Sequence, residues 1–291
     1  MTSEPGTPLV RLLDHLGTLG LPKGAARKAL KSGKVSVGGV PTADSGRMVK
    51  PGLVVYKPTA PRIQPGRDVA LVHRDSHLAI VYKPSGMLSV AAPKRGRDDN
   101  LISWMAKRFG AAHPVHRIDE PTSGLMMVAF DKETQMGLKA LLEKHEVERR
   151  YLALVHGKFP NGDQVFDSFL GRHWKTGRRC SVEPDEGGRK SRTYARRIAR
   201  LGPISLVEAR LETGRTHQVR IHLSEAGFPV IADKLYNGRN DGTMRRLALH
   251  AAVLGFVHPR TGEALRFDAG LPDDMEQYRR KRVEARAKHA R

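Results

Sequence analysis

The feature that most constrains this chain is a single acid placed in a short polar turn between apolar segments. The turn contains His-Arg-Ile-Asp at 116–119 and Thr-Ser-Gly-Leu at 122–125, and residues 126–130 form an apolar run of strand length. Asp119 is therefore expected on a loop held against a core strand, a position that catalytic groups favour. The alternative is a surface pair of Arg117 and Asp119 beside an ordinary turn, and these residues alone do not decide between the two.

Charge and composition narrow the class of partner. The 291 residues carry a formal charge of +21, and the pI near 10.5 describes a surface that attracts polyanions. Nucleic acid is the commonest partner of so basic a protein, and an anionic membrane is the second. No apolar run approaches a spanning helix and residues 1–5 lack the pattern of a signal peptide, so we expect a cytoplasmic protein. Cys180 is the only cysteine, which excludes an intrachain disulfide and a thiolate metal cluster.

Residues 1–57 are expected to form a small domain of their own. Apolar residues recur at helical spacing over 9–16, residues 25–32 predict a second helix ended by Gly33, and residues 35–40 predict a hairpin. Residues 1–58 hold nine Lys or Arg and three Asp or Glu, a net of +6, which suits phosphate contact, although such a cluster could also be a solvated face. Residues 58–69 are rich in proline and predict a linker.

Residues 70–275 are expected to form an α+β domain. Strand-like runs at 78–82, 151–156, 193–198 and 206–211 alternate with helical stretches such as 134–144. Residues 171–200 carry ten Lys or Arg against three acids, and they are either a long loop that grips RNA or a solvated insertion. Residues 276–291 form a basic tail that is compatible with a helix but is expected to fray in solvent rather than pack.

Several further motifs stand in a characteristic order. They are Lys-Pro-Ser-Gly-Met at 83–87, Arg-Tyr-Leu-Ala-Leu-Val at 150–155, Gly-Arg-Thr-His-Gln-Val-Arg-Ile-His at 214–222, Ala-Asp-Lys-Leu-Tyr at 232–236, Leu-His-Ala at 249–251 and His-Pro-Arg-Thr-Gly-Glu at 258–263. Together with residues 116–125 they resemble the RluA-type family of RNA pseudouridine synthases, over roughly residues 70–275. Ile118 stands where this family usually has Leu, and Glu120-Pro121 stands where it usually has a basic or polar pair.

The resemblance implies a fold for each domain. Residues 70–275 are expected to adopt the pseudouridine synthase fold, a mixed and largely antiparallel sheet with a central basic cleft. The order of two helices and a hairpin in residues 1–57 resembles the S4 RNA-binding fold. One departure is Lys-Gly-Ala-Ala at 23–26, where that fold more often has a Ser-Arg element.

The resemblance also implies a reaction, the isomerisation of uridine to pseudouridine in structured RNA. The N-glycosidic bond breaks, the uracil rotates, and its C5 joins the ribose C1′, so no cofactor and no metal are expected. Asp119 is implied as the nucleophile, or as the base of an elimination through a glycal. An acid among apolar strands needs an adjacent cation to stay ionised, and Arg215 is the implied partner. A structural ion pair or a phosphate contact is the other reading of Arg215.

Five more residues receive roles from the same motifs. Tyr151 is implied to stack on the uracil and to take part in removing the C5 proton, although a core tyrosine would also fit this strand. Arg117 is implied to fill the gap left by a flipped uridine, and Val219 to pack under the base. Lys83 and Arg220 are expected as phosphate contacts, or as solvated surface charges.

Other chemistries fit less well. The histidines do not form a His-Glu-x-x-His zinc motif, and the nucleophile elbow of hydrolases and the phosphate loop of nucleotide triphosphatases are both absent from the sequence. Two function classes remain. The first is a monomeric synthase acting on RNA, with ribosomal RNA expected over transfer RNA, and the second is a non-catalytic RNA-binding or ribosome-assembly protein with the same fold. The combination of Asp119, Tyr151 and Arg215 favours the enzyme.

Overall fold

The computed structural model describes residues 8–18, 21–31, 35–37, 40–49, 54–56, 69–92, 99–240 and 243–289. The chain forms two compact units, Met1–Thr59 and Ala60–Arg291. The predicted linker at 58–69 lies outside the described residues except for its last position. No helix among the described residues is long and apolar enough to cross a membrane.

The first unit contains two short helices and small strands. The helices are α1 (Leu12–Thr18) and α2 (Lys23–Lys31), and the strands are β1 (Val10–Arg11), β2 (Val35–Val37), β3 (Val40–Pro41), β4 (Met48–Val49) and β5 (Val54–Tyr56). β2 pairs antiparallel with both β3 and β5, so the predicted order of two helices and a hairpin is confirmed. Leu12, Leu16 and Leu30 are buried in its core, whereas Leu9 precedes the first helix and is exposed. Gly33, the predicted helix end, lies outside the described residues.

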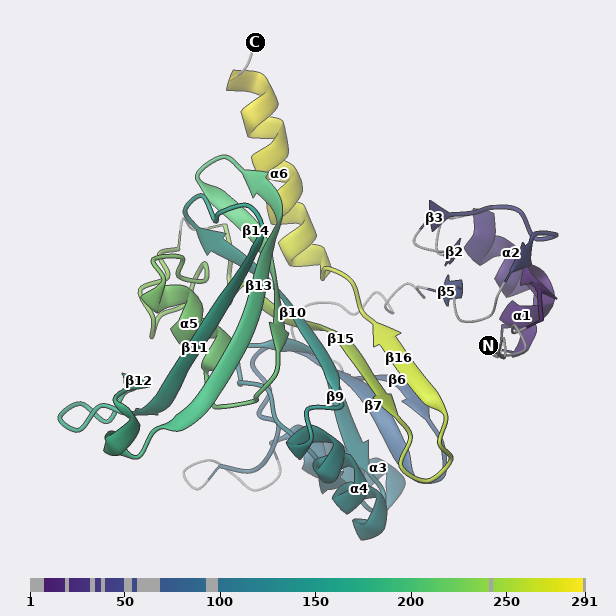
Figure 1. Ribbon diagram of the computed structural model, residues 1–291, viewed down its shortest axis with the longest axis horizontal. Coiled ribbons are helices and arrows are strands. Elements are labelled where there is room, and N and C mark those ends of the chain that lie inside the picture. The colour runs from purple at the N-terminus through teal and green to yellow at the C-terminus, as the bar shows by residue number, and fades with distance from the viewer. Residues whose placement is uncertain are drawn as a thin grey trace, which may run out of the picture. The chain divides into compact units, whose positions relative to one another are not determined.

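The second unit is organised around one large sheet (Figure 1). Its strands are β6 (Ala70–Arg74), β7 (Leu78–Lys83), β8 (His113–Pro114), β9 (Ser123–Ala129), β10 (Glu148–His156), β11 (Asp163–Arg172), β12 (Arg179–Val182), β13 (Arg189–Leu201), β14 (Ile204–Leu211), β15 (Leu249–Val257) and β16 (Ala264–Asp268). The strand order is β12-β11-β13-β14-β10-β15-β9-β7-β6, with β16 on β15 and β8 on β9. Among the described pairs only β9 and β15 run parallel, so the sheet is mixed and largely antiparallel, as predicted.

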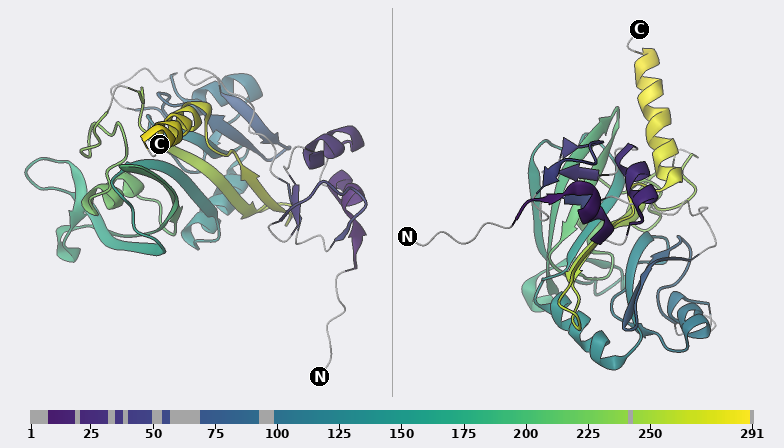
Figure 2. Two further views of the ribbon diagram at one scale, coloured as in Figure 1. Left: turned by 90° about the horizontal axis from the view of Figure 1, so that it is seen from above. Right: turned by 90° about the vertical axis from the view of Figure 1, so that its right-hand side faces the viewer.

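Both faces of the sheet are covered by packed side chains. Successive side chains of a strand point to opposite faces, so one strand can contribute to two separate cores. Ala79 and Val81 of β7 join a core that includes buried side chains of α3 (Leu101–Phe109), α5 (Gln218–Glu225) and α6 (Asp273–His289). Leu78 and Ile80 join a second core with Leu138 of α4 (Lys132–Glu143). Figure 2 shows α3 and α4 on opposite sides of the sheet. β7 and β9 are thus buried on both faces and form a rigid base for the loops at their ends.

The Thr-Ser-Gly motif lies at the parallel contact between the described strands β9 and β15. Ser123 and Gly124 open β9 and pair with His250 and Ala251 of β15. Gly124 has a φ of 126°, and a Cβ there would lie within 2.7 Å of three backbone atoms of Ala251. Only glycine allows the two backbones to approach so closely in this conformation. The motif therefore fixes where the chain leaves the loop that carries Asp119.

The structure revises two expectations for the second unit. The strand expected at 193–198 lies within β13, but the rest of residues 171–200, expected as a loop or insertion, is also mainly strand, with short connections on either side of β12. Ser191, Thr193 and Ala195 are buried at every second position of β13, the pattern of a strand with one covered face. The basic tail is helical, as its sequence allows, but α6 begins earlier, at Asp273, and its first turns bury Met275 and Tyr278 against the sheet. Beyond these turns α6 extends away from the sheet (Figures 1 and 2).

Candidate active site

A pocket of about 640 Å³ lies where the loop after β8, strand β10 and the start of α5 meet. Its lining includes six of the seven predicted site residues, namely Arg117, Asp119, Tyr151, Arg215, Val219 and Arg220. Lys83 is not part of the lining. Six Lys or Arg and two carboxylates line the pocket, so the predicted cleft is strongly basic.

The loop that carries Asp119 is fixed on both sides of the acid. Ser89 Oγ donates to the carbonyl of Ile118 at 2.7 Å, and the amide of Thr122 donates to the carbonyl of Asp119 at 3.0 Å. The amide of Gly86 donates to the carbonyl of Glu120 at 2.8 Å. The segment after β7 therefore supports the turn, and the carboxylate of Asp119 is presented to the pocket by a rigid backbone.

Lys83 belongs to this support and is not placed to contact phosphate, contrary to the prediction. Its side chain is fully buried, and its Nζ donates to the carbonyls of Pro84, Met87 and Glu120 at 2.9, 2.7 and 3.2 Å. These three acceptors match the three donors of an ammonium group. Burial lowers the pKa of Lys83 to about 7, and the carboxylates of Asp119 and Glu120 oppose that shift.

Arg220, not Arg215, is the cation paired with Asp119. Arg220 Nη1 donates to Asp119 Oδ2 at 3.0 Å, and its Nε and Nη2 donate to the two oxygens of Asp233 at 2.7 and 2.8 Å. The side chain is almost fully buried, which excludes the predicted phosphate contact in this conformation. Arg215 precedes α5, and its Nε points to the carbonyl of Lys190 at 3.4 Å instead. The difference arises because the first turn of α5 directs residue 220, and not residue 215, towards the acid.

Gln218 holds the segment that precedes α5. Its Oε1 accepts from the hydroxyl of Thr213 and from the amide of Arg215, both at 2.9 Å. Its Nε2 donates to the carbonyl of Arg192 at 3.0 Å and to Thr193 Oγ1 at 2.9 Å. The Gly-Arg-Thr-His segment is therefore tied to β13, and the positions of its side chains around the pocket depend on this one amide.

His217 is a site residue that the sequence argument did not identify. It adopts a left-handed conformation with a φ of 61°, which places its Nε2 3.9 Å from Asp119 Oδ1. Its Nδ1 lies 2.9 Å from the hydroxyl oxygen of Tyr236, and that hydroxyl donates to the carbonyl of Arg179 at 3.1 Å. Burial lowers the pKa of His217, although the carboxylate of Asp119 opposes this shift. Asp233 and Tyr236 were also missed, although the 232–236 motif contains both and was noted without a role.

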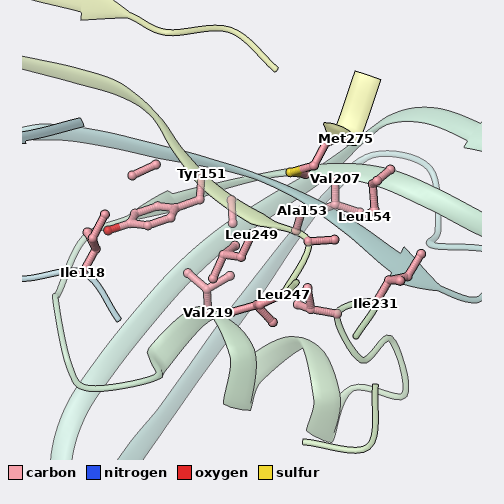
Figure 3. Packing of buried hydrophobic residues seen from close by; sticks show 14 of the residues in the cluster. Ile118, Tyr151, Ala153, Leu154, Val207, Val219, Ile231, Leu247, Leu249 and Met275 are labelled. Atoms are coloured by element: carbon pink, nitrogen blue, oxygen red, sulfur yellow. The ribbon is translucent and has the colours of Figure 1, made fainter. Parts of the chain in front are cut away.

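Tyr151 and Val219 form the apolar side of the pocket. Tyr151 is largely buried, and its ring extends from β10 towards Ile118 while Val219 approaches from α5 (Figure 3). Burial raises the pKa of Tyr151 to about 12, so its phenol is protonated at neutral pH. Arg117 is exposed at the edge of the pocket. The roles of these residues towards RNA remain predictions.

Among the described residues, no three His, Cys, Asp or Glu side chains are grouped so that they could hold a metal ion. The expectation that the reaction needs no metal remains a prediction.

Comparison with known proteins places these features in a family. Residues 77–225 match the family model described as RNA pseudouridylate synthase. A ribosomal large subunit pseudouridine synthase D of Zymomonas mobilis is 39% identical over 226 residues, covering 71% of this chain and 70% of that protein. An uncharacterized RNA pseudouridine synthase of Bacillus subtilis is 38% identical over 216 residues, covering 72% and 71% of the two chains.

A solved structure agrees with these sequences. The human RNA pseudouridylate synthase domain containing 1 is similar with a TM-score of 0.61 and 27% identity, over 72% of this chain and 87% of that one. The chain belongs to the RluA-type family of RNA pseudouridine synthases and is an isomerase.

Proposed function

We propose that this enzyme converts specific uridines of ribosomal RNA to pseudouridine, with Asp119 as its essential acid. The observation that carries the proposal is the contact of Asp119 with the buried Arg220, in a pocket where Lys and Arg outnumber carboxylates. Relatives from Zymomonas mobilis and Nitrosomonas europaea are named ribosomal large subunit pseudouridine synthase D, which supports ribosomal RNA over transfer RNA. A protein that only binds RNA has no need of a carboxylate presented so rigidly beside a buried cation.

The geometry of Asp119 supports direct participation in the reaction. Arg220 binds Oδ2, whereas Oδ1 faces His217 at 3.9 Å. Oδ1 is therefore the oxygen that we assign to the ribose, where it either bonds to C1′ as the N-glycosidic bond breaks or removes a proton from C2′ to give a glycal. The ring of Tyr151 provides a flat apolar surface for the uracil, and Val219 packs below the same space.

Surface features of each unit, taken separately, support RNA as the substrate. Arg117 lies at its edge, where it can enter the gap left by a flipped nucleotide. Between β11 and β12, Trp174 is 76% exposed and its ring is contacted by Lys175, an arrangement suited to stacking on an unpaired base. In the first unit, the cations of α2 are exposed while Ala26, Ala29 and Leu30 are buried, which suits an S4-like domain that binds phosphate.

The proposal is tested by mapping pseudouridines in total RNA from cells with and without the gene. At least one position in ribosomal RNA should lose its pseudouridine in the deletion strain. The wild-type gene should restore that position, and a gene encoding Asp119→Asn should not. An unchanged map of ribosomal RNA, or restoration by the Asp119→Asn gene, would contradict the proposal.

A further inference from the structure

We propose that Arg149 stabilises the negative charge on the uracil while it is detached from the ribose. The inference rests on the proposed function, because it concerns the same pocket and the same reaction. It adds a residue to which neither the motifs nor the pairing of Asp119 assigns a role.

Arg149 is placed by the period of β10. It lies two residues before Tyr151, so both side chains point to the same face of the strand and both line the pocket. Arg149 is 8% exposed and Tyr151 is 9% exposed. The cation is therefore next to the surface that we assign to the uracil, and solvent hardly reaches it.

The hydrogen bonds of Arg149 are incomplete. Nη2 donates to the carbonyl of Glu212 at 2.9 Å, whereas the buried Nε has no acceptor among the described residues. No described carboxylate forms an ion pair with this guanidinium. The neighbouring Arg150, on the other face of β10, differs in having two carboxylates beside it, Glu148 at 2.6 Å and Glu208 at 3.3 Å, although its buried Nε also makes no hydrogen bond within the described structure. A buried cation without a carboxylate is unfavourable for the free enzyme, and such groups are retained where they bind a ligand.

Gly214 makes the space that this side chain occupies. A Cβ at position 214 would lie 2.5 Å from Arg149 Nη1, and the φ of Gly214 is not in the left-handed region. A larger residue at this position would displace the guanidinium of Arg149, so glycine leaves room for its observed position. Burial, together with the nearby charge of Arg215, lowers the pKa of Arg149, but a guanidinium remains protonated in proteins. Arg149 therefore brings a fixed, incompletely paired positive charge to the pocket.

The reaction creates an anion at this place. When the N1–C1′ bond breaks, its electron pair stays on N1 and delocalises over N1, O2 and O4 of the uracil, while C1′ bonds to Asp119 or C2′ loses a proton to it. The charge disappears when C5 attacks C1′ and displaces Asp119 as a carboxylate, or, in the glycal route, when C5 bonds to C1′ while Asp119 returns its proton to C2′. The C5 proton then leaves. Donors aimed at such a transient charge in a dry pocket stabilise it strongly. Arg149 would donate to an oxygen of the uracil and would exchange no proton.

The test uses ribosomal RNA carrying either uridine or 5-fluorouridine at the target position. Fluorine withdraws electrons and makes the uracil a better leaving group, so the fluorinated substrate depends less on an external cation. Single-turnover loss of the starting nucleoside is measured for the wild type and for Arg149→Gln. We expect Arg149→Gln to slow uridine by about 100-fold to 1,000-fold, as for the loss of one oxyanion donor, and 5-fluorouridine by clearly less. Arg149→Lys, which keeps the charge, should recover part of the rate.

Two controls separate this role from others. Arg150→Gln, on the other face of the strand, should change both rates equally and by only a few fold. The urea midpoint of Arg149→Gln should match or exceed that of the wild type, because the variant removes an incompletely paired buried charge.

Three results would overturn the assignment. Equal losses on both substrates together with a lower urea midpoint would show a structural role. Weaker RNA binding with a flatter salt dependence and a normal rate would show a phosphate contact. An unchanged rate on uridine would show no role at all. The proposed function is judged separately in the same assay, because it falls if Asp119→Asn retains turnover.

Discussion

Arg220 binds Asp119 with one nitrogen of its guanidinium and Asp233 with the other two. Asp233 does not line the pocket and its side chain is fully buried, so it acts on Asp119 through Arg220. It also accepts from the backbone amides of Leu235 and Tyr236 at 3.1 and 3.2 Å. The position of Asp119 beside the substrate is therefore set by a residue that the substrate does not reach. Asp119 is thus assigned to contact with the reacting atoms, whereas Arg220 and Asp233 hold it in position.

Asp119→Asn should abolish turnover and leave RNA binding intact. Asparagine keeps the size of the side chain but can neither attack C1′ nor accept a proton as a carboxylate does. We expect single-turnover activity to fall by several orders of magnitude, with a dissociation constant for RNA within a few fold of the wild type. Retention of more than about a tenth of the activity, which is roughly 1.4 kcal/mol in the barrier, would remove Asp119 from this role.

Asp233→Asn should lower both stability and turnover, although residue 233 lies outside the pocket. The variant leaves the buried Arg220 with one carboxylate in place of two, and we expect the free energy of unfolding to fall by roughly 3 kcal/mol. The rate per folded molecule should also fall, with little change in the KM for RNA, because Arg220 is then free to move Asp119. Urea unfolding and single-turnover kinetics on folded protein measure the two effects. Lower stability with an unchanged rate would make Asp233 purely structural.

The sequence predicts well what depends on period and motif. Runs of alternating or continuous apolar residues located β7, β9, β10 and β14, and the motifs brought six of the seven predicted site residues to one pocket. The partner of Asp119 could not be deduced in the same way. Arg215 and Arg220 are five residues apart in one motif, and which of them reaches the acid depends on where α5 begins and how it is tilted.

The same limit explains the other missed features. A lysine in a Lys-Pro motif can be exposed or buried, and the sequence does not show which. The structure shows that Lys83 is buried, with three carbonyls as acceptors around its Nζ. A strand was predicted at 193–198, but the cations at 189, 190 and 192 obscured the period-two pattern of small buried residues there, so the full length of β13 was missed. Arg149 could have been noticed, because it stands two residues before Tyr151 on a strand and therefore shares its face.

Lys83→Met should weaken the enzyme without changing its electrostatic attraction to RNA. Methionine fills most of the same space but removes the hydrogen bonds that Lys83 gives to the carbonyls of Pro84, Met87 and Glu120, so the loop that carries Asp119 loses support. We expect lower stability and a lower single-turnover rate. The slope of log affinity against log salt should stay that of the wild type, since no phosphate contact is removed. A flatter slope for Lys83→Met would restore the phosphate role.

The enzyme should lose stability in mild acid partly through His222. Burial lowers the pKa of His222 to about 4, and unfolding returns it to its ordinary value of 6.5. Between these values the unfolded chain binds a proton that the folded chain does not, so the free energy of unfolding falls as the pH drops from about 6.5 to about 4. The full effect corresponds to roughly 3 kcal/mol. His222→Gln should have a shallower pH dependence than the wild type, whereas substitution of the exposed His173 by Gln should not; parallel curves for all three proteins would contradict the prediction.

Cations of α2 should contribute to RNA affinity and not to the chemical step. Arg27 and Lys31 are exposed and one helical turn apart, while Ala29 and Leu30 hold the helix in the small core. The double substitution of Arg27 and Lys31 by Ala therefore keeps the domain folded and removes up to two phosphate contacts. With each phosphate contact that is lost, fewer counterions are released when the protein binds RNA. The slope of log affinity against log salt should therefore become shallower by roughly 0.7 to 0.9 per contact. Single-turnover rates at saturating RNA should stay within about twofold of the wild type, since Asp119, Tyr151 and Arg220 lie in the other unit. An unchanged slope would show that this face of α2 is merely solvated, and a lower rate at saturation would show that the domain helps to position the uridine.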